Sequence, residues 1–537
     1  IAVEPFRIEV PPLVPMADGR FVACHVRASA TELRENPALA ANFSRTYALL
    51  SPTPQRERIA PVKLNEYVEY DATGLASLAS AGEVTALELS RLAREAHDEV
   101  NPRINAVIEF YEDAETVAGA NGGLFHGVPF LRKDIGASEA GRLQENGSRL
   151  FKGCRSDTDS YFFRCAREAG LRTLGRTTTP ELGSTMMTES ILNGITGNPW
   201  NLQRSAGGSS GGAAAAVAAG ITPIAHGSDG GGSTRIPASW CGLVGLNPSR
   251  GRVSGGPNRQ DAGSGLSRDF ILCRTVRDMA AALDVFSGSH PGDPFIIVQP
   301  NRSYMEELSQ PTGRLRVGVA RTSWGAIDLD PEVLHAVEAT ATLFQEMGHV
   351  VVDIEPIYEP AEYSKFDSAQ TTAIWLEEAA RAMGRAISSD TLEPVNLKRY
   401  RYGRDLPLSH ARDVQEGLRK MRFRVGEAIH AFDILLTPTM PIVAVPHGGI
   451  YSAMNPEISV EEYLETDTAI CQYTGVFNVT GQPSVSLPLA QSEGGLPVGI
   501  QIVGRFGDEA TLVRVARDLE EARPWRHRRP ITRAGKS

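Results

Sequence analysis

The chain has 537 residues, of which 22% are charged and 42% hydrophobic, as is ordinary for a globular protein. Its formal charge of −10 argues against nucleic acid or an anionic membrane as the main partner, and no apolar run reaches membrane-spanning length. The length alone would suit roughly three or four domains, although a large α/β chain often folds as one.

The cysteine content and the first residues of the chain indicate the expected cellular compartment. The six cysteines are scattered without disulfide-like or metal-ligand spacing, so we expect reduced thiols and no bound metal. Residues 1–10 lack the basic and apolar regions of a signal peptide, which leaves the cytoplasm as the expected location. The chain does not begin with Met, and whether a segment has been removed stays open.

The N-terminal region divides into an arm and the start of a larger body. Residues 1–69 contain several prolines, which favour an extended arm with one helix near Ala30–Leu50. This arm is expected either to pack against the body or to form a contact between subunits, so a homodimer is left open. Further on, Thr85-x-x-Glu88 is a capping box, and the apolar positions after it predict a helix that ends before Asn101-Pro102.

Two glycine-rich loops, each holding serine, dominate the middle of the sequence. The first, 207–212, reads Gly-Gly-Ser-Ser-Gly-Gly and leads into an alanine block, 213–219, that predicts a helix. Residues 221–225 predict a short buried strand that ends at Gly227. The second loop then reads Ser-Asp-Gly-Gly-Gly-Ser-Thr-Arg-Ile-Pro over 228–237. One loop would begin a helix and the other would follow a strand, which are places where free backbone N–H groups meet negative charge.

The first loop has three other interpretations. A flexible linker fits the composition, but the loop runs directly into a helix-forming block. A phosphate-binding P-loop is excluded because no Gly-Lys-Ser/Thr follows. A nucleophile elbow with Ser209 would need a strand immediately before it, and 198–206 is a poor strand. In that interpretation His226 would be the base of a Ser-His-Asp arrangement, although a single histidine at a strand end is usually structural.

The C-terminal half predicts alternating elements. A helix that starts at Asp330-Pro331 and ends at Gly348 lies between strands at 315–320 and 350–354, which makes a β-α-β unit. Residues 360–432 are expected to be mostly helical. Strands are expected after Asp433, Gly481 and Gly495, and the basic tail 526–529 is expected to be a solvated end.

Together the two loops resemble the core of the amidase signature family, serine hydrolases with a Ser-Ser-Lys triad. The resemblance implies that Ser233 is the nucleophile and Ser209 the bridging serine. Gly127-Val-Pro-Phe-Leu-Arg-Lys-Asp134 resembles the family motif that holds the lysine, which makes Lys133 the implied base. It also implies a cis peptide bond between Gly208 and Ser209, with the Ser209 hydroxyl in hydrogen-bond reach of both Lys133 and Ser233.

The chemistry explains why these residue types are needed. A serine hydroxyl is a poor nucleophile until a base takes its proton, and a lysine is a base only when it is neutral. Lys133 must therefore be buried away from a carboxylate. The backbone N–H groups of 230–233, which are Gly230, Gly231, Gly232 and Ser233, would stabilise the oxyanion. Ser210, Asp229 and Arg235 are expected to support the site, and Arg235 is expected to pair with a nearby carboxylate.

Two positions depart from the family pattern. Gly230 stands where a larger residue is usual, which indicates a more mobile loop or a roomier site. Phe270-Ile271 replaces the usual Gly-Pro and puts a turn there in doubt. Pro248–Ser254 and Phe477–Pro483 are similar to the branch of 6-aminohexanoate cyclic-dimer hydrolases.

We therefore expect one large α/β domain over 70–537, with a mixed twisted sheet flanked by helices. The resemblance implies hydrolysis of a small-molecule carboxamide, carbamate or ester through an acyl-enzyme, without a cofactor. Substrate selection is expected from a variable segment, 360–470, and from the turn 179–187, where Leu182 and Gly183 would contact substrate. The alternatives are the catalytic subunit of a glutamine-dependent tRNA amidotransferase and a non-catalytic binding relative.

Overall fold

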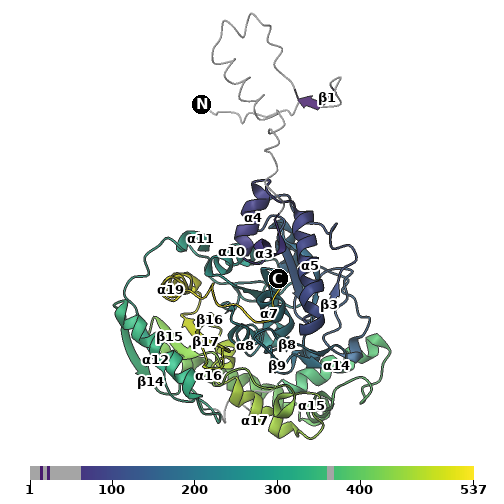
Figure 1. The fold of residues 1–537 in the computed structure, drawn as a ribbon. Coiled ribbons are helices and arrows are strands. Elements are labelled where there is room, and N and C mark those ends of the chain that lie inside the picture. Colours follow the sequence, from purple (N-terminus) through teal and green to yellow (C-terminus); the bar gives the residue numbers. More distant parts are fainter. Residues whose placement is uncertain (1–12, 16–20, 24–61, 360–367, 537) are drawn as a thin grey trace, which may run out of the picture. The chain divides into compact units, whose positions relative to one another are not determined.

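The computed structural model describes residues 13–15, 21–23, 62–359 and 368–536. In the N-terminal unit, β1 (Leu13–Pro15) and β2 (Phe21–Ala23) pair antiparallel. The second unit begins at Val62 and is an α/β domain in which a mixed eleven-stranded sheet is flanked by helices (Figure 1). This is the expected fold class. The helix expected near Ala30–Leu50 lies outside the described residues.

The sheet is parallel at two places and antiparallel elsewhere. β14, β13 and β15 run parallel, as do β10, β4 and β5. The strands in sheet order are β14 (Val350–Ile354), β13 (Arg316–Ala320), β15 (Ile434–Pro438), β17 (Pro497–Gly504), β16 (Ser484–Gln491), β11 (Val244–Asn247), β12 (Arg268–Cys273), β10 (Ile224–Asp229), β4 (Pro129–Lys133), β5 (Arg172–Thr177) and β3 (Val107–Phe110).

Helices cover this sheet, and small hairpins lie outside it. The described helices are α3 (Leu64–Tyr67), α4 (Ala72–Ser80), α5 (Ala86–Ile104), α6 (Tyr161–Glu168), α7 (Gly211–Ala218), α8 (Arg235–Cys241), α9 (Ala262–Gly265), α10 (Val276–Phe286), α11 (Tyr304–Glu307), α12 (Pro331–Glu346), α14 (Ala369–Met383), α15 (Pro394–Asp405), α16 (Ser409–Ile429), α17 (Val460–Ile470), α18 (Gly475–Thr480) and α19 (Glu509–Ala522). The hairpins are β6 (Glu189–Ser190) with β7 (Gly194–Ile195), and β8 (Gly197–Asn198) with β9 (Asn201–Ser205).

Several predicted elements are confirmed. The capping box at Thr85 starts α5, and Asp330 caps α12 through its carboxylate. β13, α12 and β14 form the expected β-α-β unit. Residues 369–429 are mostly helical, and strands follow Asp433, Gly481 and Gly495.

Three local predictions are wrong. Helix α5 continues through Pro102 to Ile104, because the Asn101 side chain binds the backbone of Ala106 and Val107 and closes the turn beyond the helix. Strand β10 begins at Ile224 rather than 221 and continues to Asp229, since the chain first turns at Gly220, where φ is +84°.

The third concerns residues 198–206, before the first loop, which the sequence predicts to be a poor strand. Residues 201–205 form β9, but this strand pairs only with β8, outside the large sheet. A nucleophile elbow leaves a strand of the main sheet, so the position of β9 argues against an elbow at Ser209. The doubtful turn at Phe270-Ile271 is a buried stretch of β12.

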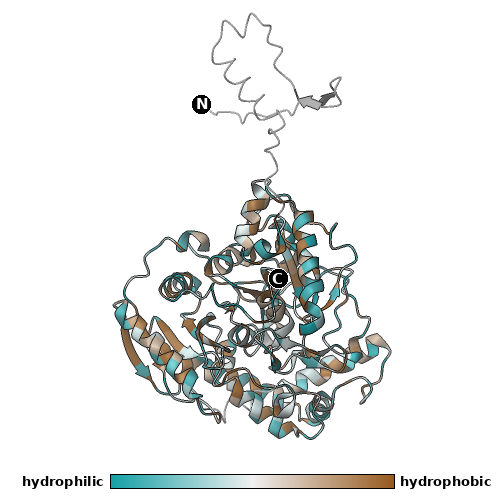
Figure 2. Cartoon of the chain, in the orientation of Figure 1, coloured by the Kyte–Doolittle hydropathy of each residue, from teal (hydrophilic) through white to brown (hydrophobic). Residues whose placement is uncertain are grey.

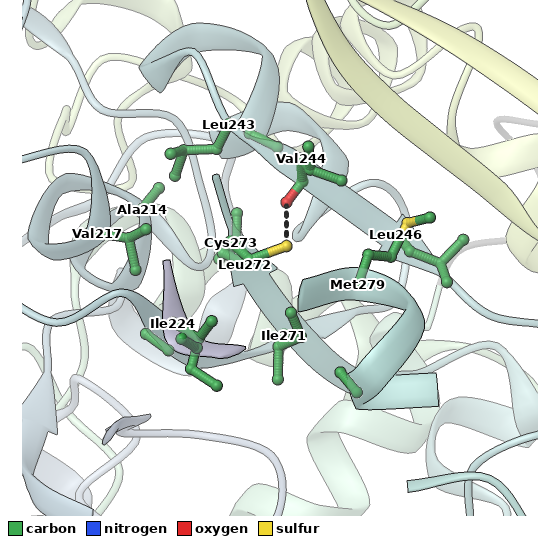
Figure 3. Packing of buried hydrophobic residues seen from close by; sticks show 14 of the residues in the cluster. Ala214, Val217, Ile224, Leu243, Val244, Leu246, Ile271, Leu272, Cys273 and Met279 are labelled. Carbon is green, nitrogen blue, oxygen red and sulfur yellow. Dashed lines mark hydrogen bonds between the residues drawn. The ribbon is translucent and has the colours of Figure 1, made fainter. Parts of the chain in front are cut away.

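The core surrounds α7 and the centre of the sheet. In Figure 2 the strands are mostly hydrophobic, and hydrophilic residues lie on the outer turns of the covering helices. Every residue of α7 is buried, and its alanines let the helix approach the sheet closely. Figure 3 shows Ala214 and Val217 of α7 near Ile224, Leu272 and Leu243. The position of α7 is therefore fixed by packing, and with it the loop at its N-terminus.

Cysteines, membrane-spanning helices and metal-ligand clusters also bear on the class of protein. Their five cysteines are all free thiols. Within the described part of the chain, no helix combines the length and apolar character needed to cross a bilayer, and no cluster of three or more metal-ligating side chains occurs.

Candidate active site

The expected lysine and serines converge at one edge of the sheet. Lys133 is the last residue of β4, and Ser228 lies near the end of its parallel neighbour β10. Ser209 and Ser210 belong to the loop that begins α7, and Ser233 belongs to the loop between β10 and α8. Parallel strands end at the same edge, so the fold brings both loops to the lysine.

The amine of Lys133 lies among hydroxyl groups. Its Nζ is 2.7 Å from Ser209 Oγ, 2.9 Å from Ser210 Oγ and 3.0 Å from Ser228 Oγ. The carbonyl oxygen of Ser228 is 3.4 Å away. No carboxylate within the described residues forms an ion pair with this amine. The first part of the expected geometry, contact between Lys133 and Ser209, is therefore confirmed.

Hydrogen-bond counting assigns directions around this amine. Ser210 donates to the Ser228 carbonyl at 3.2 Å and accepts from the Ser228 N–H at 3.3 Å, which leaves it able to accept only from Lys133. A neutral amine has two N–H groups and one lone pair. Donation to Ser210 and to Ser228 uses both N–H groups, and the lone pair remains for the Ser209 hydroxyl.

Burial increases from Ser233 to the lysine. Ser233 is half-buried, Ser209 is 4% exposed and Lys133 is fully buried. Burial disfavours the charged amine and lowers the pKa of Lys133 to about 7, although the charges of Asp269 and Asp229 oppose the shift. The lysine can therefore be neutral near pH 7, as a general base requires.

The loop that carries Ser233 is held by a buried ion pair. Arg235 donates to both carboxylate oxygens of Asp229 at 2.9 Å, and both side chains are buried. Asp229 also accepts from the N–H groups of Gly232 and Thr234. Burial alone would raise the pKa of Asp229, but Arg235 and these hydrogen bonds hold it well below its usual range. The expected carboxylate partner of Arg235 is thus confirmed as Asp229.

Further hydrogen bonds hold Arg235 and the glycine loop that precedes Ser233. Arg235 donates to the Thr474 carbonyl at 2.9 Å, to Gln501 at 2.9 Å and to Ser484 at 3.1 Å. The Thr474 hydroxyl donates to the Gly231 carbonyl at 2.7 Å. The chain after α17 therefore supports the loop that carries Ser233.

The expected oxyanion donors are corrected at one position. The N–H of Gly232 donates to Asp229 at 2.8 Å and is not free. The N–H groups of Gly230, Gly231 and Ser233 have no partner within the described residues. Gly230 is exposed, and a Cβ there would meet only Ser267 at 3.8 Å, so the site is roomy at this departure from the family pattern.

Ser209, the expected bridging serine, has the expected backbone. The peptide bond between Gly208 and Ser209 is cis, and Thr179 donates to the Ser209 carbonyl at 2.9 Å. Gly183 lies beside it, where a Cβ would be 3.2 Å from Ser209 Oγ. The second part of the expected geometry is not met, because no hydrogen bond joins Ser209 Oγ to Ser233 Oγ within the described residues. The loops instead join through Ser210 N–H and the Ser233 carbonyl, 3.2 Å apart.

The turn 179–187 reaches the same place. Leu182 and Gly183 both have positive φ, +59° and +64°, and Leu182 packs partly into a cluster with Leu376 of α14. The expected substrate-contact turn is thus brought next to Ser209.

His226 does not fit the Ser-His-Asp alternative. One ring nitrogen lies 3.0 Å from Asp269, and the other accepts from the backbone N–H of Lys133 at 3.2 Å. Burial lowers the pKa of His226, and both nitrogens are occupied away from the serines. The histidine therefore positions the end of β4.

Sequence reasoning missed Ser228 and the supporting layer. Ser228 is the first residue of the second quoted loop, so its place at a strand end beside Asp229 was a usable signal. Thr474 and Gln501 carry no local signal, because they come from strands and loops more than 200 positions away.

We predict that the Asp229–Arg235 pair is essential to stability. Arg235→Met should lower the free energy of unfolding by about 3–5 kcal/mol, because it leaves a carboxylate buried without its cation. The double variant Asp229→Asn with Arg235→Met should recover part of this loss in urea unfolding. Arg419→Met breaks an exposed pair with Glu416 and should leave the free energy of unfolding nearly unchanged. Equal losses in the buried and exposed variants would contradict the prediction.

Comparison with known proteins agrees with this geometry. The family model described as Amidase matches residues 88–513. The chain is 37% identical over 476 residues to a 6-aminohexanoate-cyclic-dimer hydrolase of Paenarthrobacter ureafaciens, covering 86% of this chain and 96% of that relative.

Solved structures give the same result. The structure of 6-aminohexanoate cyclic dimer hydrolase complexed with substrate matches with a TM-score of 0.81 and 36% identity, over 87% of this chain and 99% of the other. A bacterial aryl acylamidase of the amidase signature family matches with a TM-score of 0.75 and 25% identity, over 85% and 96% of the two chains. The chain therefore belongs to the amidase signature family and is a hydrolase that acts on carbon–nitrogen bonds.

Proposed function

We propose that this enzyme hydrolyses a small carboxamide through an acyl-enzyme, with Ser233 as nucleophile, Ser209 as proton bridge and Lys133 as base. The observation that carries the proposal is the buried, carboxylate-free amine of Lys133, 2.7 Å from Ser209 Oγ. A neutral lysine with its lone pair directed at a serine is a general base without another evident purpose.

In the proposed acylation, Ser209 gives its proton to Lys133 and takes the proton of Ser233. The Ser233 oxygen then attacks the amide carbonyl carbon. Such contacts often tighten only when substrate binds. The hydrogen bond from Ser210 N–H to the Ser233 carbonyl supports the proposal, because it joins the two loops that carry these hydroxyl groups. The proton returns through Ser209 to the leaving amine, and water later cleaves the acyl ester by the reverse relay.

The tetrahedral oxyanion needs donors that are already in place. The free N–H groups of Gly230, Gly231 and Ser233 are the proposed donors, and one such donor is worth about a hundredfold or more in rate. Asp229 supports them indirectly, because its hydrogen bonds with Gly232 and Thr234 fix the curve of the loop.

For the substrate, the relatives give the first test. We propose a cyclic or linear amide of the size of the 6-aminohexanoate cyclic dimer, which is the substrate class named for the relatives above. We expect the exposed Gly230 and the turn at Leu182–Gly183 to contact the substrate, and the described part of the variable segment, 368–470, to contribute to its selection. Carbamates and esters remain within the same chemistry.

We expect the isolated chain to hydrolyse simple amides. Purified protein should release amine from an aryl amide and open the 6-aminohexanoate cyclic dimer to its linear dimer, without glutamine, tRNA or partner subunits. Ser233→Ala should abolish both reactions and serves as the matched control. Activity that appears only with glutamine and partner subunits would favour the amidotransferase alternative instead, and binding without turnover would favour a non-catalytic relative.

The base is tested by comparing two buried side chains. Lys133→Met should reduce the acylation rate by at least about a thousandfold, because Ser209 loses its proton acceptor. His226→Gln should keep activity within about tenfold, since His226 only holds the end of β4. Circular dichroism checks that both variants fold. A silent lysine variant beside an inactive histidine variant would contradict the proposed triad.

The pH dependence follows from the sign of the lysine shift. The pKa of Lys133 is about 7, and only the neutral form accepts a proton. The kcat/KM should therefore rise with pH through about 7 and then level, falling about tenfold per unit well below it. A profile that is flat from pH 5 to 9 under conditions where acylation limits the rate would show that this amine is not the base.

A further inference from the structure

A cavity lies away from the two serine loops. Its volume is about 260 Å³, and Glu69, Asp71 and Trp200 are among the residues that line it. The cavity is notable for its arginines, which come from two segments far apart in the sequence. They are Arg274, Arg277, Arg526, Arg528 and Arg529.

Two of these arginines have carboxylate partners. Arg277 binds both oxygens of Asp71 at 2.6 and 3.1 Å, and Arg529 binds Glu69 at 2.8 Å. Glu69 and Asp71 are the only acidic residues of the lining, so five guanidinium groups face two carboxylates. The lining therefore keeps a net positive charge in a chain whose total is −10.

The other arginines have only neutral partners. Arg274 donates to the carbonyls of Val68 and Tyr70, and Arg528 donates to the Pro488 carbonyl. Burial, and after it the charge of Arg529, lower the pKa of Arg274 to about 10, although the charges of Asp278, Glu69 and Asp71 oppose the shift. It remains charged at neutral pH.

One donor is left over. The Nε of Arg529 is buried and has no hydrogen-bond partner within the described residues. A buried guanidinium N–H without an acceptor costs free energy, and a carboxylate or phosphate oxygen is the acceptor that fits it best. The expectation of a solvated basic tail at 526–529 holds for Arg526 and His527, which are exposed, and is wrong for Arg528 and Arg529, which are half-buried and bind the body of the protein.

The cavity has a definite place relative to the proposed active site. Helices α7 and α8 begin at the two serine loops, and their last turns, with Ala218 and Cys241, line the cavity. Figure 1 draws the C-terminal end of the chain beside α7, and Ala534 N–H donates to the Ala219 carbonyl at 2.9 Å. Trp200 and Trp525 add aromatic surface to the lining.

We propose that this cavity is a second, non-catalytic site that binds a small molecule bearing a carboxylate or phosphate group. The arginines supply the charge and the forked donors that such oxyanions prefer, and the tryptophans supply apolar surface for the rest of the molecule. The site is separate from the serine loops, so its occupancy does not depend on the proposed reaction.

The proposal is tested by isothermal titration calorimetry on the full chain. The probes are inorganic phosphate and malonate, with chloride at matched ionic strength as the reference. We expect saturable binding of at least one probe, and the comparison of the two distinguishes a phosphate from a carboxylate ligand. Chloride should give no saturable signal.

Matched arginine variants locate the site. Arg529→Gln removes the guanidinium whose Nε has no acceptor. Arg526→Gln removes an exposed cation that donates to the Glu69 carbonyl. Because Arg526 is exposed, its substitution is less disruptive to folding. Each should weaken binding by about tenfold, the worth of one lost charged hydrogen bond. Arg523→Gln removes the same charge from the same segment but outside the cavity, and should leave affinity unchanged.

Either of two results would overturn the proposal. One is the absence of saturable binding of both probes to the unmodified chain. The other is equal affinity in Arg526→Gln, Arg529→Gln and Arg523→Gln, measured on variants whose circular dichroism matches that of the unmodified chain.

Discussion

Everything at the proposed catalytic centre depends on keeping the amine of Lys133 out of water and away from carboxylates. Burial of this kind lowers the pKa from 10.5 to about 7, which corresponds to about 5 kcal/mol against the charged form. Because the folded chain binds the proton less readily than the unfolded chain, this cost is absent above pH 10.5 and complete below about 7. The other interactions of the domain have to offset this free-energy cost.

Two structural devices meet this constraint. The parallel pair β4 and β10 brings Lys133 and Ser228 to one edge of the sheet. The fully buried helix α7 fixes the position of the serines at its N-terminus, which contact the lysine amine. The carboxylate of Asp229 is paired with Arg235 and forms no ion pair with the lysine, although its charge still opposes part of the lowering of the Lys133 pKa. One buried ion pair therefore shapes the loop that carries Ser233, while the lysine beside it stays unpaired.

The same two helices connect the proposed catalytic centre to the arginine-lined cavity. Positive charge at the C-terminal ends of α7 and α8 is favourable, since helix carbonyls there carry partial negative charge. In the described structure this charge exceeds what Glu69 and Asp71 can neutralise.

Much of this organisation could be predicted from the sequence, where the signal is local. The capping box at Thr85, the alanine block of α7 and the Asp330-Pro331 start of α12 each act through near neighbours, and each was confirmed. The end of α5 was missed because a side chain, Asn101, overrides the usual effect of proline.

Contacts between residues far apart in the sequence could not be predicted from local patterns. The contact of Lys133 with Ser209 followed from motifs and family resemblance, but its contact with Ser228 depends on which strands are neighbours. The commitment of the Gly232 N–H to Asp229 depends on the curve of the loop. The burial of Arg528 and Arg529 depends on where the tail meets β16 and the turn between α3 and α4, and a run of arginines does not indicate that.

The most direct test of the account is to identify the serine that carries the acyl group. The enzyme would be mixed with an activated ester, quenched with acid within milliseconds to seconds, digested and mapped by mass spectrometry. The account predicts an adduct on Ser233 that forms much more slowly in Lys133→Met and is absent in Ser233→Ala. An adduct on Ser209 in the unmodified enzyme, or formation on Ser233 at an undiminished rate without the lysine, would contradict it.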